Sequence, residues 1–291
     1  MDKEIEEVTL RSIAASRGDY RLVRGAWVHT SARLAEDIEL EPGALVGANV
    51  EIGRRCRIGA GAVIYGPTRI GEDNHIHASA VLGGAPQDVG YIDEPTRLEI
   101  GNRNVFREGV TVHRASTKER GVTIVGSDNY FMSYSHVGHD SVVEDHVILA
   151  NGVLIAGHSR IHSRVNMGGG SAIAQFVTIG RLAFVGAMGG ARKDLEPFLS
   201  HDIGRRGPEV EPTCVNEVGL KRAGFSQEVI NNLRTAFKVL YLRKEPLLDM
   251  DQGREEIAAR GALCDEVVEL FDFVARKRAS KMGRQRSLPT K

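Results

Sequence analysis

An apolar residue recurs at every sixth position through most of the first two thirds of this chain. The line runs from Val28 to Leu82, resumes from Ile100 to Val112, and continues one residue out of step from Val125 to Val185. All 24 positions on it hold Val, Ile, Leu, Met or Phe, although only 42% of the chain is hydrophobic. A six-residue period is typical of a parallel β-helix, whose coils have three six-residue sides. The sequence therefore predicts an all-β solenoid of about eight coils.

A second line of residues supports this interpretation. From Ser135 to Ala183, the position four residues after each apolar residue holds Ser, Val or Ala. Large and small residues at these two positions fit the two inward-facing sites on each side of a triangular coil. Glycine often follows the large apolar residue, as Gly53 and Gly59 do, and we expect it to ease a tight backbone there.

Breaks in the repeat predict the domain organisation. Residues 83–99 and 113–124 are expected to be loops extruded from a β-helix that spans 26–190, because insertions in a solenoid are pushed outward. Residues 1–25 form an N-terminal extension and 191–211, which include prolines, a connector. Helical spacing behind Ser226, and again in 265–278, predicts a C-terminal α-helical domain over 212–280 that covers one end of the solenoid. We interpret 281–291 as a solvated basic tail, with an acidic partner or a membrane surface as the sharper alternative.

Composition narrows the function classes. Lysine plus arginine and aspartate plus glutamate each number 38, so no strong net charge points to nucleic acid. The three cysteines lie far apart, which predicts neither a disulfide framework nor a cysteine metal site and fits a reducing compartment. The charged N-terminus lacks the apolar core of a signal peptide, and no apolar run is long enough to span a bilayer. We expect a cytoplasmic protein without a transmembrane segment.

Five of the ten histidines fall within residues 135–163. Because residues eighteen apart stack in neighbouring coils, His139, Gly157 and Gln175 share one line, and Asp140 and His158 share the next. Both lines lie off the inward positions, so we expect these side chains to face outward near a corner, with His136 at the same edge. His146 and His162 fall off these lines and are expected to be surface residues.

Such a patch suits acyl transfer without a protein nucleophile. A neutral imidazole such as His139 is a good general base near neutral pH, and an adjacent carboxylate, Asp140, would orient it. A backbone N–H at Gly157 could stabilise an oxyanion. The simpler alternative, in which the histidines only bond one another and nearby carbonyls, stays open at this point.

The stretches HVGHDS, IAGHS, AQF, PQDVGYIDEPTRLEIGNRNVFREGVTVHRAS and GLKRAGFS resemble the acyl carrier protein–UDP-N-acetylglucosamine O-acyltransferases. The resemblance covers roughly residues 26–245. It implies a homotrimer of left-handed parallel β-helices with C-terminal helical domains, active sites between subunits, and no cofactor or metal. It also implies transfer of a 3-hydroxyacyl chain from acyl carrier protein to the 3-hydroxyl of the nucleotide sugar, the step that opens lipid A biosynthesis.

The resemblance also implies roles for individual residues. His139 matches the general base, Asp140 the acid beside it, and Gly157 the backbone donor to the thioester oxygen. The remaining matched positions are substrate-binding: Gln87 and Asp88 for the glucosamine ring, His136 and His158 in the cleft, Gln175 for the nucleotide sugar, and Asn216 and Arg222 for the uridine and phosphate or the carrier protein.

Departures from the family pattern leave alternatives open. Ala174, Gly90 and Ala223 stand where the family usually has histidine, lysine and arginine, the GNPA segment after the β-helix is missing, and Ala187 could shorten the acyl groove. One alternative is a related acyltransferase with another nucleotide-sugar or an amine acceptor. Another is a non-catalytic solenoid with a binding or scaffold role. A third is a β-helical carbonic anhydrase, which would hold zinc on three histidines, for example His136, His139 and His158.

Overall fold

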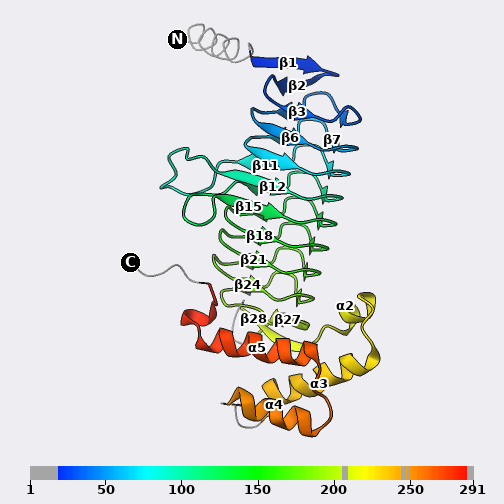
Figure 1. Cartoon of the computed structure of the whole chain (residues 1–291), viewed down its shortest axis with the longest axis vertical. Helices are drawn as coiled ribbons and strands as arrows, with labels where there is room; N and C mark the ends of the chain where they lie inside the picture. The colour runs from blue at the N-terminus through cyan, green and yellow to red at the C-terminus, as the bar shows by residue number, and fades with distance from the viewer. Residues whose placement is uncertain (1–18, 205–208, 244–246, 248, 287–291) are drawn as a thin grey trace.

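The computed structural model describes residues 19–204, 209–243, 247 and 249–286. Short strands stack into a tall column, and helices lie at the end of the column that comes later in the chain (Figure 1). Residues 1–18, most of the predicted N-terminal extension, and 287–291 of the predicted tail lie outside the described residues. None of the described helices has the length and apolar character that a membrane span requires.

The strands form three sheets, here called A, B and C, and each strand in the column pairs with the third strand after it. Sheet A contains β1 (Tyr20–Val23), β2 (Ala26–His29), β5 (Leu45–Val46), β8 (Val63–Ile64), β11 (Val81–Gly84), β14 (Thr111–His113), β17 (His136–Val137), β20 (Leu154–Ile155), β23 (Ala172–Ile173) and β26 (Gly190–Ala191). Sheet B contains β3 (Arg33–Leu34), β6 (Val50–Ile52), β9 (Thr68–Ile70), β12 (Arg97–Ile100), β15 (Val122–Val125), β18 (Val142–Val143), β21 (Arg160–Ile161) and β24 (Thr178–Ile179). Sheet C contains β4 (Glu39–Leu40), β7 (Arg57–Ile58), β10 (His75–Ile76), β13 (Val105–Phe106), β16 (Tyr130–Phe131), β19 (Ile148–Leu149), β22 (Asn166–Met167), β25 (Phe184–Val185), β27 (Leu199–Ile203) and β28 (Val210–Val215).

The register confirms the predicted stacking of residues eighteen apart. His136 pairs with Leu154, and Leu154 pairs with Ala172, in parallel strands of sheet A. Pairing is parallel throughout the column, whereas β1 runs antiparallel to β2 and β27 antiparallel to β28, at the two ends. Each residue in a coil therefore has its counterparts directly above and below it.

Both predicted inward lines are buried. Ile58, Ile64 and Ile155 on the large-residue line are fully buried, and so are Ser141 and Ser159 on the small-residue line. The small-residue line also carries three buried asparagines, which the repeat pattern does not predict. Asn104 donates to the Oδ1 of Asn74 at 2.9 Å, and the N–H of Asn129 donates to the Oδ1 of Asn104 at 3.0 Å, so the amides bond from coil to coil. The side-chain amides of Asn74 and Asn104 in this ladder also donate to backbone carbonyls, those of Gly101 and Gly126, and are therefore satisfied inside an otherwise apolar core.

The tight backbone at each corner does not lie at the glycine that follows the large apolar residue, where we expected it. The left-handed conformation falls three residues after the large apolar residue, where the three corners hold residues such as Arg55, Asp140 and Gly152. The glycine directly after the apolar residue is required for another reason. A β-carbon on Gly53 would lie 2.7 Å from the carbonyl oxygen of Gly71 in the next coil. Close approach between coils, rather than a positive φ, excludes a side chain there.

The two extruded loops are shorter than predicted. Residues 97–99 belong to β12 and residue 113 to β14, so the irregular segments are 85–96 and 114–121. Both leave the column on the same side (Figure 1). Lys118 of the second loop contacts Asp88 of the first at 2.5 Å, and Arg114 donates to Asp93 at 3.1 Å, so the two loops support each other.

The predicted connector, 191–211, contains strands. β26 pairs with β23 through Ala191, which takes the place of a larger aliphatic residue on the apolar line, and β27 pairs with β25. The column therefore continues past the point where the sequence period becomes hard to see. Pro212 is tolerated because β28 is the last strand of sheet C, and the register shifts beside it.

The α-helices among the described residues are α2 (Glu217–Arg222), α3 (Gln227–Tyr241), α4 (Met250–Ala259) and α5 (Asp265–Ala279), followed by a short 3-10 turn, η2 (Lys281–Gly283). Ser226 caps α3 as predicted, accepting from the N–H of Val229 at 3.3 Å. Leu182 and Phe198, from the last two coils, share one apolar cluster with Leu233 and Phe271 of the helices. This cluster joins the helices to the end of the column and removes an open sheet edge from water.

Candidate active site

The corner between sheets A and B, after β17 and β20, carries the predicted catalytic residues. His139 and Asp140 follow β17, and His158 follows β20 one coil later. Asp140 and His158 both take the left-handed conformation, at φ 60° and 62°. We expected these side chains to face outward, but all three are buried, with 6%, 2% and 3% exposure. The reason is the loop 114–121, which lies over this corner and contacts it through Ser116 and Glu119.

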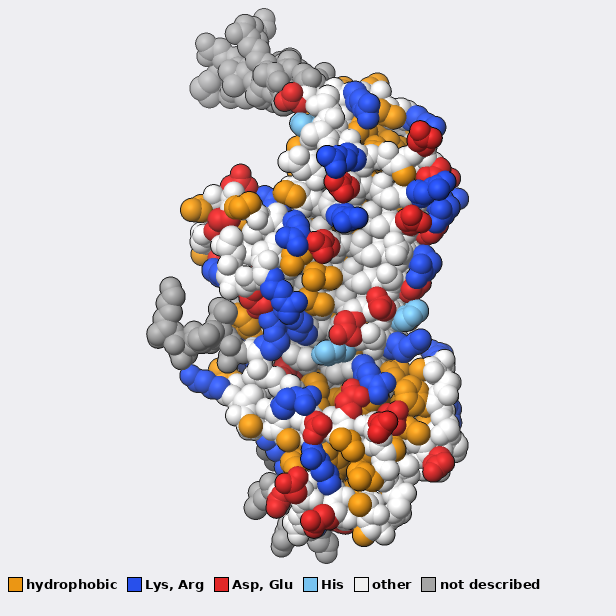
Figure 2. All heavy atoms as spheres, in the orientation of Figure 1, with side chains coloured by type: hydrophobic (Ala, Val, Ile, Leu, Met, Phe, Trp, Pro, Cys, Tyr) orange, Lys and Arg blue, Asp and Glu red, His pale blue; other side chains and the backbone are white. Residues whose placement is uncertain are grey.

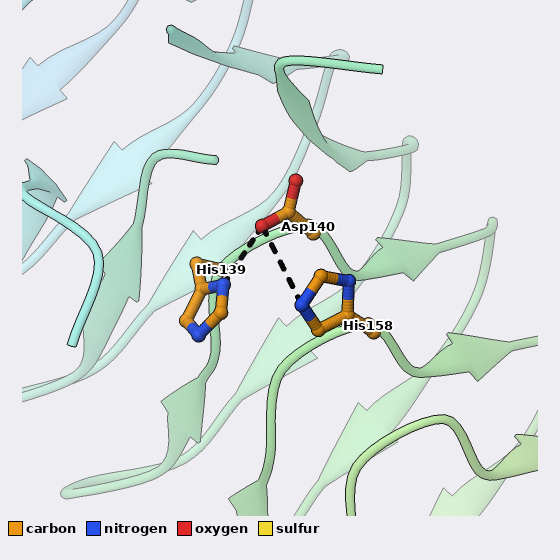
Figure 3. A group of neighbouring side chains, drawn as sticks. All are labelled: His139, Asp140 and His158. Atoms are coloured by element: carbon orange, nitrogen blue, oxygen red, sulfur yellow. Dashed lines mark hydrogen bonds and ion pairs between the residues drawn. The ribbon is translucent and has the colours of Figure 1, made fainter. Parts of the chain in front are cut away.

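A hydrogen bond joins the side chains of His139 and Asp140 (Figure 3). The Nδ1 of His139 lies 2.7 Å from the Oδ2 of Asp140, and that oxygen also accepts from the N–H and hydroxyl of Ser116. Burial alone would raise the pKa of Asp140, but the hydrogen bonds from His139 and Ser116 outweigh it and lower that pKa. An ionised carboxylate accepts only, so Nδ1 of His139 is the donor to Asp140, and the neutral form of this imidazole has its lone pair on Nε2.

His158 belongs to the same cluster. Its Nδ1 donates to the Oε1 of Glu119 at 3.0 Å, and its Nε2 lies 3.9 Å from the Oδ2 of Asp140. The ring stacks on Phe176, with centroids 4.5 Å apart. Glu119 was not among the predicted site residues, because the insertion that carries it breaks the period and gives no register to place it.

Gly157 lies under the ring of His139. A β-carbon at Gly157 would fall 2.9 Å from the Nε2 and Cε1 atoms of His139, so any side chain would displace the imidazole. The N–H of His158 donates to the carbonyl of His139 at 2.9 Å, which keeps the two corners in register. Gln175, one coil further on, is exposed, in agreement with the prediction that its side chain faces outward.

His136 and the first loop flank this corner. The Nδ1 of His136 lies 2.8 Å from the hydroxyl of Thr111. Burial, with the nearby His113 and His139, lowers the pKa of His136 to about 4. Asp88 is half-buried, and its hydrogen bonds from Lys118 and from the N–H of Gly90 lower its pKa. Gln87 is exposed on the same loop.

Asn216 and Arg222 are not brought to this corner within one chain. They line a pocket of about 400 Å³ on the sheet C side, between α2 and the outer faces of β19, β22 and β25. Asn216 also has a structural role, since it accepts from the N–H of Gly219 at 3.0 Å and donates to the carbonyl of Leu182 at 2.8 Å. His146, expected to be a plain surface residue, is exposed but lines this pocket.

His139, Asp140 and His158 are also the described residues whose ligand atoms lie close enough to share a metal ion, within 4.8 Å of one another. The set is two imidazoles and a carboxylate, and His136 lies outside it. This differs from the three histidines that a β-helical carbonic anhydrase would need. The Nδ1 atoms of His139 and His158 already bond Asp140 and Glu119.

Comparison with known proteins first defines the class. The family of bacterial hexapeptide transferases matches residues 49–84 and 123–157, which confirms the predicted six-residue repeat. The model of the second domain of UDP-N-acetylglucosamine O-acyltransferase matches residues 198–283. The protein is thus similar to the hexapeptide-repeat transferases over the column and to one member of that class over the helices.

Individual relatives identify the family. The acyl-[acyl-carrier-protein]–UDP-N-acetylglucosamine O-acyltransferase of Burkholderia mallei is 42% identical over 194 residues, which is 66% of this chain and 72% of the relative. The UDP-N-acetylglucosamine acyltransferase of Bacteroides fragilis superposes with a TM-score of 0.81 at 30% identity, covering 88% of this chain and 97% of the other. The Arabidopsis enzyme superposes with a TM-score of 0.78 at 28% identity, covering 88% and 90%. This chain belongs to the acyl-[acyl-carrier-protein]–UDP-N-acetylglucosamine O-acyltransferase family.

Proposed function

We propose that this protein transfers a 3-hydroxyacyl chain from acyl carrier protein to the 3-hydroxyl of UDP-N-acetylglucosamine, with His139 as the general base. The observation that carries the proposal is the buried pair of His139 and Asp140, joined at 2.7 Å. This pair leaves the Nε2 of His139 as the basic atom, away from the carboxylate. Membership of the family supports the choice of donor and acceptor.

The reaction follows from this arrangement. The Nε2 of His139 takes the proton of the sugar hydroxyl while the hydroxyl oxygen attacks the thioester carbonyl. Asp140 stabilises the imidazolium that forms, and the N–H of Gly157 donates to the oxyanion of the tetrahedral intermediate. The C–S bond then breaks, and His139 returns its proton to the departing thiolate. The products are the acylated nucleotide sugar and the free thiol of the carrier protein, with no cofactor or metal.

The other predicted residues hold the substrates in this proposal. His136 and His158 line the cleft, Gln87 and Asp88 bind the glucosamine ring, and Gln175 contacts the nucleotide sugar. Gly90 stands where the family usually has a lysine, but the ammonium of Lys118 lies 2.5 Å from the carboxylate of Asp88. The second loop thus supplies a cation beside this part of the acceptor site.

We further propose that the active unit is a homotrimer of left-handed β-helices. Asn216 and Arg222 face a pocket on the sheet C side, whereas His139 lies at the corner between sheets A and B. A neighbouring subunit would bring the two half-sites together across one cleft. In this proposal the β-helix begins near residue 26 and continues through β27, the helices α2 to α5 form the C-terminal helical domain, and the enzyme works in the cytoplasm.

A related acyltransferase with another nucleotide-sugar acceptor is the second candidate. Ala223 lines the pocket that contains Arg222, and the family's second arginine is missing there. One fewer cation would weaken the hold on a diphosphate and would favour an acceptor with less negative charge.

The experiment is an acyl-transfer assay with 3-hydroxyacyl carrier protein and UDP-N-acetylglucosamine, run on the wild type and on His139→Ala. We expect the wild type to transfer the acyl chain. In His139→Ala the transfer rate should fall about 10²-fold or more, the usual contribution of a general base. No transfer by a folded wild type would sink the acceptor assignment. A screen of nucleotide sugars would then test the second candidate, and failure of every acceptor would favour a non-catalytic scaffold.

A further inference from the structure

The described part of the basic tail is not a solvated end, contrary to our expectation. After α5 and η2, residues 284–286 turn back along the column and run beside the later coils (Figure 1). They pass along the corner between sheets A and B, which carries Gln175 and His158 in successive coils. The tail therefore approaches the candidate active site from the side of the helices.

A buried carboxylate anchors this segment. Asp194 is fully buried and accepts from the backbone N–H of Thr178 and of Gln285, both at 2.7 Å. Its own N–H donates to the carbonyl of Gly283 at 2.8 Å. Arg284 donates to the carbonyls of Arg192 and Gln175, at 2.7 and 3.1 Å. These contacts fix the path of the tail without touching His139, Asp140 or Glu119.

Arg286 then reaches the active-site cluster itself. The Nη1 of Arg286 donates to the carbonyl of His158 at 2.8 Å. The Nη2 of Arg286 donates to both carboxylate oxygens of Glu119, at 2.9 and 2.7 Å. One guanidinium therefore joins the corner of the column to the loop that covers it. Glu119 in turn accepts from the Nδ1 of His158, whose Nε2 points toward Asp140.

Two guanidiniums meet one carboxylate at this corner, since Arg160 and Arg286 both contact Glu119. The second carboxylate of the corner, Asp140, lies 3.9 Å from the Nε2 of His158. Burial, followed by the charge of Arg286, lowers the pKa of Arg160 to about 10, so Arg160 stays protonated near neutral pH. Without Arg286, Glu119 would keep Arg160 and His158 as its partners and lose the contact that ties it to the tail.

We propose that Arg286 is a positioning residue for the acyltransferase site, acting through Glu119 to hold His158 and the loop 114–121 over the pair of His139 and Asp140. The tail is then part of the active-site wall and not a tether for another partner. This inference rests on the proposed function, because positioning has a kinetic effect only if His139 performs the transfer. It adds Glu119 and Arg286 to the residues on which turnover depends.

The test is a double-mutant cycle on kcat with Arg286→Met, Glu119→Gln and the two combined. Each single change is expected to lower kcat about tenfold or more, and the double variant should lose little beyond the larger single loss, because both act on one contact. Arg286→Lys is expected to restore only part of the activity, since an ammonium cannot bridge the carbonyl and both carboxylate oxygens. Arg284→Met is the matched control, because Arg284 holds the same tail without touching Glu119, and it should cost less than threefold.

Additive losses, or equal losses in the Arg284 and Arg286 variants, would overturn the proposal and leave the tail as a simple structural clasp. A full kcat in folded Arg286→Met would overturn it as well. Hydrogen exchange of residues 114–121 gives a readout without turnover, and it should rise in Arg286→Met more than in Arg284→Met. If the wild type transfers no acyl chain, the proposed function fails, and the positioning role in catalysis fails with it. The exchange result would then separately decide whether Arg286 holds the loop.

Discussion

Two histidine–carboxylate pairs lie at neighbouring corners of the column, and their contacts are nearly equal in length. The Nδ1 of His139 is 2.7 Å from Asp140, and the Nδ1 of His162 is 2.8 Å from Glu144. Their surroundings differ. The side chains of the first pair are 7% and 1% exposed, whereas both members of the second are 40% exposed. The first pair lies at the corner between sheets A and B, the second at the corner between sheets B and C.

The loop 114–121 produces this difference. It leaves the column after β14 and returns over the corner between sheets A and B, where Ser116 gives Asp140 two further hydrogen bonds. The exposed corner, by contrast, carries surface ion pairs such as Arg55 with Asp73 and Arg103 with Asp128 (the mixed charges along the coils in Figure 2). A short contact between histidine and carboxylate is therefore not sufficient for a site. Exclusion of water by an inserted loop strengthens the electrostatic interaction of one pair and not of the other.

The largest effect should come from the buried carboxylate. Asp140→Asn removes the charge that stabilises the imidazolium and allows the wrong tautomer of His139, so kcat should fall about 10²-fold or more. Glu144→Gln, the same change in the exposed pair, should leave kcat within twofold. Steady-state kinetics on the two variants measures both effects, and similar losses would break the distinction between the pairs.

A smaller effect should follow from the loop contact. Ser116→Ala removes the hydroxyl donor to Asp140 and keeps the backbone donor, so kcat should fall about tenfold, since a hydrogen bond to an ionised group is worth ~1.5 kcal/mol. Ser163→Ala removes the matching hydroxyl from Glu144 and is the control. If the control variant lost as much activity as Ser116→Ala, the loop would not be what distinguishes the first corner.

The free energy of unfolding should depend on pH in the acid range, because His136 is buried beside this corner. The pKa of His136 is held at about 4, below its ordinary 6.5, so the folded protein binds this proton less readily than the unfolded chain. The free energy of unfolding should therefore fall as the pH drops from 6.5 toward 4. His136→Gln should remove part of that fall, as measured by thermal melting at several pH values. Exposed His146→Gln is the matched control, and an unchanged pH dependence in His136→Gln would contradict the burial argument.

The smallest effect should be on the exposed pair. His162→Gln breaks one contact whose two side chains are each 40% exposed, and its cost in unfolding free energy should stay below about 1 kcal/mol. Urea unfolding of this variant beside the wild type gives the number. A cost of several kcal/mol would mean that exposure does not separate the two corners.

The column was predictable from the sequence because the same short pattern of apolar residues recurs on the sides of successive coils. One apolar residue in six fixes the inward face, and the eighteen-residue coil fixes which residues stack, so His139, Gly157 and His158 could be placed together. The end of the column was harder to see. Ala191 fills the apolar line with a small residue, and β28 contains Pro212, so the period fades while the pairing continues.

The burial of the site could not be predicted, because it depends on segments outside the repeat. Glu119 lies in an insertion and Arg286 in a tail, and neither has a register that sets where its side chain goes. The asparagine ladder was missed for a different reason. Asn74 and Asn104 occupy inward positions where the pattern favours small or apolar residues, and much of their side-chain hydrogen bonding is to neighbouring coils. Asn216 and Arg222 could be named from the resemblance, but their distance from His139 within one chain became clear only from the fold.

The most direct test of the central claim compares His139→Ala with His162→Ala in the acyl-transfer assay, using melting temperature to show that both variants fold. Both changes remove a histidine that bonds a carboxylate, one at the covered corner and one at the exposed corner. We expect a loss of about 10²-fold or more for His139→Ala and a change within twofold for His162→Ala. Comparable activity of the two folded variants would contradict the assignment of His139 as the base, and with it the claim that the covered corner is the catalytic site.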